Sequence, residues 1–134
     1  MTRGAMTLLE QSRAQLERVT PHQAYEEVQA GSATLIDVRM PDHRAAQGEL
    51  PGALVIDLTV LPWRLDPTFD WNIPEATDWN RRYIIVCRHS FSSSVVAAQL
   101  KEMGLVNTTD MIGGAEAWFA AGLPAGEGPA DVRA

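Results

Sequence analysis

Apolar and polar residues follow one another along this chain in a pattern that predicts alternating strands and helices. Short apolar runs rich in β-branched residues are typical of buried strands. They occur at residues 33–38, 54–56, 83–86 and 108–112. Helices are predicted at residues 6–19, 21–30, 41–47, 92–103 and 113–120. The remaining long segment, residues 57–80, has no regular period and holds Trp63, Trp71 and Trp79, so we expect a structured loop with helical turns.

Residues with strong backbone preferences mark the ends of several elements. Thr20 followed by Pro21 predicts a helix start, with threonine as N-cap and proline at the first helical position. We expect three parts: an N-terminal helical extension (residues 1–19), one domain (residues 20–124) and a C-terminal tail (residues 125–134). The tail is rich in glycine and proline and is expected to be flexible.

Strand and helix alternate four times with short connections, which is typical of an α/β fold. The pattern predicts a doubly wound, mostly parallel central sheet with helices on both faces. In such sheets ligands bind beyond the carboxyl ends of the strands. Cys87 directly follows the predicted strand at residues 83–86 and is therefore expected at this edge.

Composition and charge mainly exclude other classes of protein and partner. A chain of 134 residues with 46% hydrophobic and 21% charged residues suits one globular domain. A net charge of −6 argues against a nucleic-acid or anionic-membrane partner. No apolar run is long enough to span a bilayer, and the first ten residues lack the apolar stretch of a secretory signal, so the cytoplasm is the expected location.

The cysteine and histidine content predicts neither an internal disulfide nor a metal site. Cys87 is the only cysteine. His22, His43 and His89 fall on different predicted elements, and no spacing among them resembles a ligand set. We expect no metal and no cofactor.

Cys87 is the strongest candidate for chemistry. It lies between a predicted strand and the start of a predicted helix, where a row of unpaired backbone N–H groups and the positive end of the helix dipole stabilise a negatively charged sulfur. The same groups can hold an anion beside the thiol. The alternative is an inert buried cysteine, and the position alone leaves both open.

Four motifs occur in one order along the chain: Leu35-Ile36-Asp37-Val38-Arg39, Gly48-Glu49-Leu50-Pro51-Gly52-Ala53, Tyr83-Ile84-Ile85-Val86-Cys87, and Met111-Ile112-Gly113-Gly114 with Ala117-Trp118 and Gly122-Leu123-Pro124. Together they resemble the motifs of rhodanese-like domains, over roughly residues 21–124. The stretch from Trp63 to Pro67 is similar to that of single-domain members of an actinobacterial type.

The resemblance implies a rhodanese fold and a sulfurtransferase that carries sulfur as a cysteine persulfide. The donor would be a small molecule such as thiosulfate, and the acceptor a thiol, a cyanide-like molecule or a protein. Carried over by position, Cys87 is the catalytic residue and Asp37 and Arg39 brace the framework. The substrate-binding residues implied are those of the following loop: Arg88, His89, Ser90, Phe91, Ser92 and Ser93.

The loop departs from the family pattern at two positions. Ser90 stands where active members usually have glycine, and Ser92 where they usually have arginine. The missing arginine removes a cation that helps to bind a sulfonate. Arg88 or Arg64 could replace it, and the sequence does not decide between them.

Two other functions compete with this one. A phosphatase of this type needs an arginine at the position of Ser93 to clamp phosphate, so this interpretation is weak. The more serious alternative is a rhodanese-like sensor or docking module with little turnover, which the missing glycine and arginine favour. The retained cysteine favours an enzyme or sulfur carrier.

Overall fold

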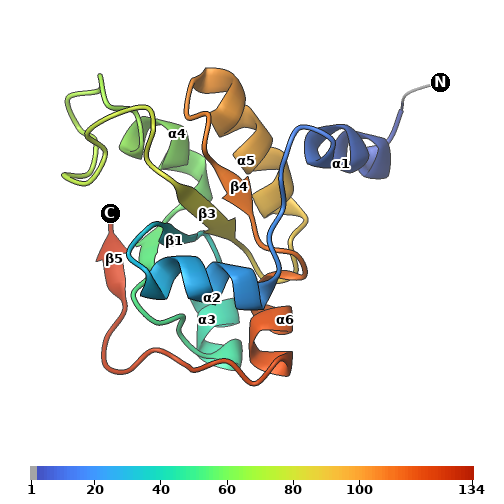
Figure 1. The fold of residues 1–134 in the computed structure, drawn as a ribbon, viewed down its shortest axis with the longest axis vertical. Coiled ribbons are helices and arrows are strands. Elements are labelled where there is room, and N and C mark those ends of the chain that lie inside the picture. The colour runs from blue at the N-terminus through green and yellow to red at the C-terminus, as the bar shows by residue number, and fades with distance from the viewer. Residues whose placement is uncertain (1–2) are drawn as a thin grey trace.

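The computed structural model describes residues 3–134, which form a five-stranded, entirely parallel sheet (Figure 1). Residues 1 and 2, part of the predicted N-terminal extension, lie outside the described residues. The spatial order is β4-β3-β1-β2-β5. The strands are β1 (Thr34–Asp37), β2 (Leu54–Ile56), β3 (Tyr83–Val86), β4 (Thr109–Asp110) and β5 (Asp131–Arg133).

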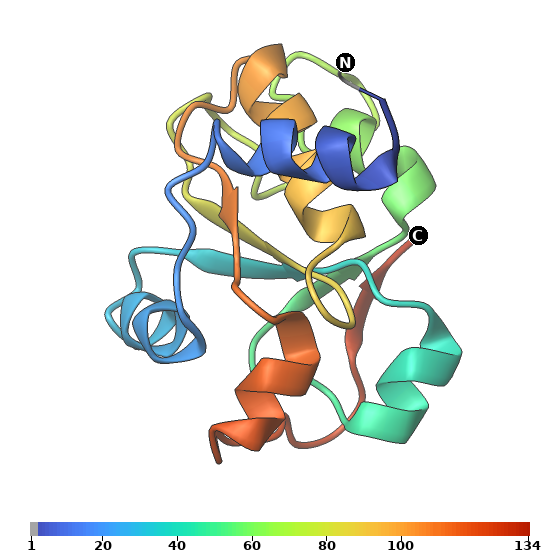
Figure 2. The same cartoon turned by 90° about the vertical axis from the view of Figure 1, so that its right-hand side faces the viewer.

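Helices cover both faces of the sheet, which confirms the doubly wound α/β fold. On one face lie α4 and α5, with α1 packed on α5; on the other lie α2, α3 and α6 (Figure 2). The helices are α1 (Ala5–Arg13), α2 (Pro21–Gln29), α3 (Pro41–Gln47), α4 (Leu61–Arg64), α5 (Ser92–Met103) and α6 (Gly114–Ala120), with a 3₁₀ turn η1 at Leu58–Val60.

The central strands are apolar on both sides because both of their faces are covered. Successive side chains of a strand point to opposite faces. Ile36 and Ile85 accordingly belong to one buried cluster, and Leu35 and Ile84 to the other. This explains the continuous apolar runs of the sequence.

The start of α2 follows the sequence prediction. Thr20 accepts a hydrogen bond from the Gln23 N–H, and the Gln23 side chain accepts one from the Thr20 N–H, which is a capping box with Pro21 at the first helical position. The leading helix is shorter than predicted, because α1 ends at Arg13. The chain then runs beside β4, where Val19 pairs with Met111.

The C-terminal segment differs from the expected flexible tail, because Asp131–Arg133 form β5 at the edge of the sheet. Val132 pairs with Val55 of β2. Arg133 makes salt bridges at 2.7 Å to both Glu75 and Asp131. Without β5, the backbone of β2 would be an unpaired sheet edge.

Candidate functional site

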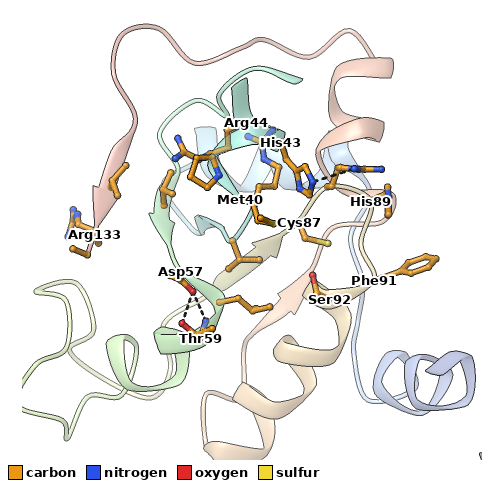
Figure 3. Close-up of a pocket in the computed structure, with 18 residues that line it drawn as sticks. Met40, His43, Arg44, Asp57, Thr59, Cys87, His89, Phe91, Ser92 and Arg133 are labelled. Carbon is orange, nitrogen blue, oxygen red and sulfur yellow. Dashed lines mark hydrogen bonds between the residues drawn. The ribbon is translucent and has the colours of Figure 1, made fainter. Parts of the chain in front are cut away.

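Cys87 lies at the carboxyl end of β3, where the chain turns into α5. Its side chain is almost buried, with 6% of the residue exposed, and it lines a cavity of about 810 Å³ (Figure 3). The cavity opens at the edge of the sheet at which parallel α/β folds bind ligands. Its walls come from the loop after Cys87, from β5, from the segment after β2 and from the start of α3.

The loop turns back on the sulfur at Ser90. The Ser90 N–H donates to Cys87 Sγ at 3.0 Å. Ser90 has a φ of 73°. Among residues 3–134 it is the one non-glycine residue whose φ is positive. This left-handed conformation is strained for a residue with a Cβ. The loop therefore keeps the turn for which a glycine is the usual residue, although a serine occupies it.

Several backbone N–H groups of the loop have no acceptor among residues 3–134. Within residues 3–134 the N–H groups of Arg88, Phe91 and Ser92 find no hydrogen-bond acceptor. Unpaired amides at the start of a helix stabilise negative charge on a nearby atom. They can act on a charged sulfur or on a bound anion.

The start of α6 holds the loop from the other side. The Ala115 N–H donates to the Cys87 carbonyl at 2.9 Å, and the Glu116 N–H to the Arg88 carbonyl at 3.0 Å. Gly114 packs so closely that a Cβ there would lie 2.6 Å from the Cys87 carbonyl oxygen. The second glycine of the Gly113-Gly114 pair is thus required by the approach of α6 to the loop.

A buried carboxylate lies behind the sulfur. Cys87 Sγ is 3.3 Å from Ser93 Oγ, and Ser93 Oγ donates to Asp110 Oδ2 at 3.0 Å. Ser94 Oγ lies 2.6 Å from the same oxygen, and Arg18 pairs with Asp110 through two nitrogens at 2.7 and 3.2 Å. Asp110 is fully buried, and the positive charge of Arg18 compensates its negative charge. The Ser93 hydroxyl can accept from a thiol while donating to the carboxylate, or donate to a thiolate instead.

Arg13 connects α1 to the same loop. Its Nη2 donates to the Ser90 carbonyl at 2.9 Å and its Nε to Ser94 Oγ at 3.1 Å. The guanidinium also lies 5.8 Å from the centre of the Phe91 ring, which is a cation–π contact. Partial burial, together with the nearby positive charge of Arg18, lowers the pKa of Arg13. The hydrogen bonds from Arg13 to the loop offset the free-energy cost of partly burying its charged guanidinium.

The loop residues predicted to bind substrate divide into two groups. Arg88, His89, Phe91 and Ser92 line the cavity. Ser90 and Ser93 are buried behind it and contact the sulfur.

A second basic residue from outside the loop joins the cavity wall. Arg88 Nη1 lies 3.4 Å from Nε2 of His43, which belongs to α3 (Figure 3). A basic edge thus lies beside Cys87.

Asp37 and Arg39 form one buried unit below the cavity. Arg39 donates from Nη2 to Asp37 Oδ2 at 2.7 Å and from Nε to Oδ1 at 3.0 Å. A further bond at 3.2 Å joins Arg39 to Gln47 at the end of α3. Arg39 lines the cavity, but its charge is paired with Asp37.

The far wall of the cavity comes from β5 through Val132 and Arg133. Hydrogen bonds from Arg133 lower the pKa of Glu75 and of Asp131 below their ordinary values. The wall is therefore held by ion pairs as well as by strand pairing.

The loop of residues 57–80 contributes less to the Cys87 cavity than its tryptophans suggested. Trp71 is 75% exposed and lines no part of the Cys87 cavity. Trp63 lines a neighbouring groove with Ser92. Arg64 donates to the Trp71 carbonyl within its own loop and does not line the cavity, whereas Arg88 does.

Three contributors to the site were missed by the sequence analysis: Arg13, Asp110 and β5. Asp110 carried a signal, because it is a charged residue inside a predicted strand. Arg13 carried none, since its contact with Ser90 spans 77 positions of the chain.

Neither a metal cluster nor a membrane span is found in residues 3–134. No three or more His, Cys, Asp and Glu side chains gather there in a way that could hold a metal ion. No helix of this part of the chain combines the length and the apolarity that crossing a bilayer needs.

Solved structures share this architecture. A protein of unknown function from Rhodopseudomonas palustris, described as a possible tyrosine phosphatase, superposes with a TM-score of 0.83 at 24% identity, over 93% of this chain and 96% of that one. The polysulfide-sulfur transferase of Wolinella succinogenes superposes with a TM-score of 0.70 at 22% identity, over 89% of this chain and 85% of that one. At these identities the likeness shows the fold.

Sequence relatives are more specific. The thiosulfate sulfurtransferase GlpE of Actinobacillus succinogenes is 35% identical over 107 residues, which are 79% of this chain and 86% of the relative. GlpE of Haemophilus influenzae is 34% identical over 108 residues, which are 81% of this chain and 92% of the relative. The family model of the rhodanese-like domain matches residues 20–121. The chain therefore belongs to the rhodanese-like domain family, whose relatives here are sulfurtransferases.

Proposed function

We propose that this chain is a sulfurtransferase whose catalytic residue is Cys87. Its thiolate takes a sulfane sulfur from a donor such as thiosulfate and passes it to a thiophilic acceptor, a thiol or a cyanide-like molecule. The observation that carries this proposal is the hydrogen bond of 3.0 Å from the Ser90 N–H to Cys87 Sγ, made at the wall of an open cavity. A cysteine that merely filled the core would need neither.

The first step transfers one neutral sulfur atom. The thiolate electron pair forms a bond to the outer sulfur of thiosulfate, the S–S bond of thiosulfate breaks, and its electron pair leaves with sulfite. Cys87 becomes a persulfide anion. In the second step the acceptor attacks the outer sulfur and the Cys87 thiolate is the leaving group, so no oxidant or reductant is consumed.

The loop stabilises the charge that moves between sulfur atoms. The Ser90 N–H contacts Sγ, and the unpaired N–H groups of Arg88, Phe91 and Ser92 are available to the outer sulfur or to the leaving anion. Arg88, beside His43, supplies the positive charge at the cavity. We propose that it replaces the arginine that active members usually carry at the position of Ser92.

Two further expectations accompany this function. The acid-rich chain is proposed to act in the cytoplasm, where a lone reactive thiol stays reduced. A phosphatase is disfavoured, because Ser93 stands where a phosphatase of this type needs an arginine to clamp phosphate.

The test is intact-mass spectrometry of the reduced protein before and after incubation with thiosulfate. We expect a gain of one sulfur atom, removed by reductant and by a thiol acceptor, and absent in Cys87→Ser. A serine variant that still transfers sulfur to cyanide would contradict the assignment. A wild-type protein that gains no sulfur from any donor would favour the sensor or docking module.

A further inference from the structure

The hydroxyl proton of Ser93 lies between two acceptors. Ser93 Oγ is 3.3 Å from Cys87 Sγ and 3.0 Å from Asp110 Oδ2. A hydroxyl has one proton, so it can donate to only one of these atoms at a time. All three residues are buried, so bulk water does not compete for the proton. Its direction therefore depends on the charges of the sulfur and of the carboxylate.

A neutral sulfur leaves the Ser93 proton with Asp110. A Cys87 thiol donates its own proton to Ser93 Oγ, and Ser93 donates to the carboxylate in turn. In a persulfide the negative charge lies on the outer sulfur, so Sγ is a weak acceptor and the charged Oδ2 is the stronger one. Asp110 therefore holds the proton whenever Cys87 is protonated or loaded with sulfur.

A Cys87 thiolate reverses this preference. With the proton on the side of Asp110, a lone pair of Ser93 Oγ would face the negative charge of Sγ in a buried site, where repulsion is poorly screened. Rotation about the Cβ–Oγ bond of Ser93 turns the proton to Sγ without moving a heavy atom. The thiolate then has two donors, the Ser93 hydroxyl and the Ser90 N–H.

Asp110 can release the Ser93 proton because other donors remain. Ser94 Oγ lies 2.6 Å from Oδ2, and Arg18 donates to the two carboxylate oxygens at 2.7 and 3.2 Å. After the rotation, the charge of the buried carboxylate is still compensated by Arg18. Arg18 lies before residues 20–121, so this support comes from outside the family match.

We propose that the Ser93 hydroxyl donates to the Cys87 thiolate as it leaves in the second step, and that Asp110 is a positioning residue that holds the Ser93 proton until then. The inference rests on the proposed sulfurtransferase function and assigns two residues to its second step. Ser93 contacts the reacting sulfur and is a catalytic residue, whereas Asp110 acts through Ser93.

The second step balances without a proton transfer. The electron pair of the acceptor bonds to the outer sulfur, the S–S bond of the persulfide breaks, and its electron pair stays on Cys87 Sγ. Negative charge thus appears on an atom that was neutral, and a donor that turns to it lowers the barrier. With sulfite as the acceptor, this step is the reverse of loading by thiosulfate, so the two rates give one equilibrium constant.

The first variant is Ser93→Ala, which removes the donor and little volume. Loading by thiosulfate and unloading by sulfite are followed by intact mass in single turnovers, and the loading rate is divided by the thiolate fraction, which ultraviolet absorbance reports. Unloading should slow by about tenfold, less than the roughly hundredfold lost with a fully preorganised donor, because Ser93 must first leave Asp110. Loading should not slow, because the thiolate has lost stabilisation before it reacts. The equilibrium constant should shift toward the persulfide by at least about tenfold.

Asp110→Asn should shift the equilibrium constant in the opposite direction. The carboxamide keeps the shape of the side chain but is a weaker acceptor, so the Ser93 proton stays on the sulfur. The thiolate is then more stable, and the equilibrium should shift toward it by about fivefold. A side chain that only supported the loop would not give shifts of opposite sign in the two variants.

Two further variants complete the test. Ser93→Thr keeps the hydroxyl and should restore the wild-type equilibrium constant. The matched control is Ser12→Ala, because Ser12 is also a buried serine of a helix, and its Oγ donates to the Leu8 carbonyl within α1. This control should keep both rates. The Ser93 variants decide the proposal even if Asp110→Asn, which leaves Arg18 without its carboxylate, fails to fold.

The outcomes separate the two proposals. If Ser93→Ala keeps the wild-type equilibrium constant or slows both directions equally, the roles of Ser93 and Asp110 are wrong while the transferase stands. The same holds if Ser93→Ala and Asp110→Asn shift the equilibrium in one direction. If the wild type gains no sulfur from thiosulfate or from polysulfide, the transferase itself is wrong.

Discussion

Replacing Arg13 by methionine removes the hydrogen bonds through which α1 holds the loop after Cys87. The side chain keeps its length and its apolar stem and loses the donors to the Ser90 carbonyl, at 2.9 Å, and to Ser94 Oγ, at 3.1 Å. Ser90 is the residue whose N–H contacts the sulfur. We therefore expect the variant to loosen the loop while the rest of the fold remains.

The magnitude follows from the strain at Ser90 and from the bonds that offset it. A non-glycine residue in the left-handed region costs about 1–2 kcal/mol. A hydrogen bond from a charged donor contributes about 1.5–3 kcal/mol, and ordering an arginine side chain costs up to about 2 kcal/mol. Arg13 is only partly buried, so a net loss of about 1.5 kcal/mol is expected, which corresponds to roughly a tenfold change.

The assay has two readouts. Persulfide formation from thiosulfate, followed by intact mass in a single turnover, should slow by about tenfold in Arg13→Met. Hydrogen exchange of the loop amides at residues 88–92 should speed up by a similar factor, and this readout does not depend on sulfur chemistry. Arg13→Lys keeps the positive charge but loses the forked donors of the guanidinium. Both readouts for this variant should therefore lie between those of the wild type and those of Arg13→Met.

Lys101→Met is the matched control for Arg13→Met. Lys101 Nζ donates to the Gln15 carbonyl at 2.8 Å and so ties the segment after α1 to α5 without touching the loop. It should change the melting temperature by a similar amount and leave both loop readouts unchanged. If it slows persulfide formation as much as Arg13→Met does, or if the loop of Arg13→Met exchanges at the wild-type rate, the hydrogen bonds of Arg13 do not position the loop.

Two further predictions concern α6 and β5. Gly114→Ala should destabilise the fold by several kcal/mol more than Gly122→Ala. Both glycines have a positive φ, but of the two only Gly114 would place a Cβ within 3 Å of backbone atoms. Equal melting temperatures for the two variants would refute the close approach. Acid should release β5, because the ion pairs with Arg133 lower the pKa values of Glu75 and Asp131 from their ordinary values of 4.5 and 3.8. The stabilisation by these pairs is complete above the ordinary pKa values, and it is lost as the pH falls through the lowered pKa values of the folded protein. Hydrogen exchange of residues 131–133, corrected for the intrinsic rate, should rise over that range in the wild type and be high at all pH values in Arg133→Gln, and a pH-independent wild type would exclude this role.

The parts of the fold that local patterns encode could be predicted from the sequence. The cap at Thr20 with Pro21 has a local cause, since both hydrogen bonds lie within four residues. The continuous apolar strand at residues 83–86 required burial on both faces, and this placed Cys87 at the ligand-binding edge. These two inferences needed no contact between distant parts of the chain.

The partners of the site were missed because they are long-range. Arg13 and Asp110 reach the loop from 77 and 17 positions away, and nothing in their local sequence marks those contacts. The three residues of β5 include two charged ones and follow a segment rich in glycine and proline, which resembles a frayed end. Their strand conformation is induced by the free edge of β2 and by the position of Glu75, which no local propensity reports.

The two segments outside the family match contact the Cys87 site from different sides. Helix α1 contacts the loop behind the sulfur through Arg13, whereas β5 faces the cavity in front of it (Figure 3). A change at Arg13 alters the groups that stabilise charge for every donor, so it should slow all donors alike. The matched domain thus contains Cys87 and its loop, and the two flanking segments lie on either side of that loop.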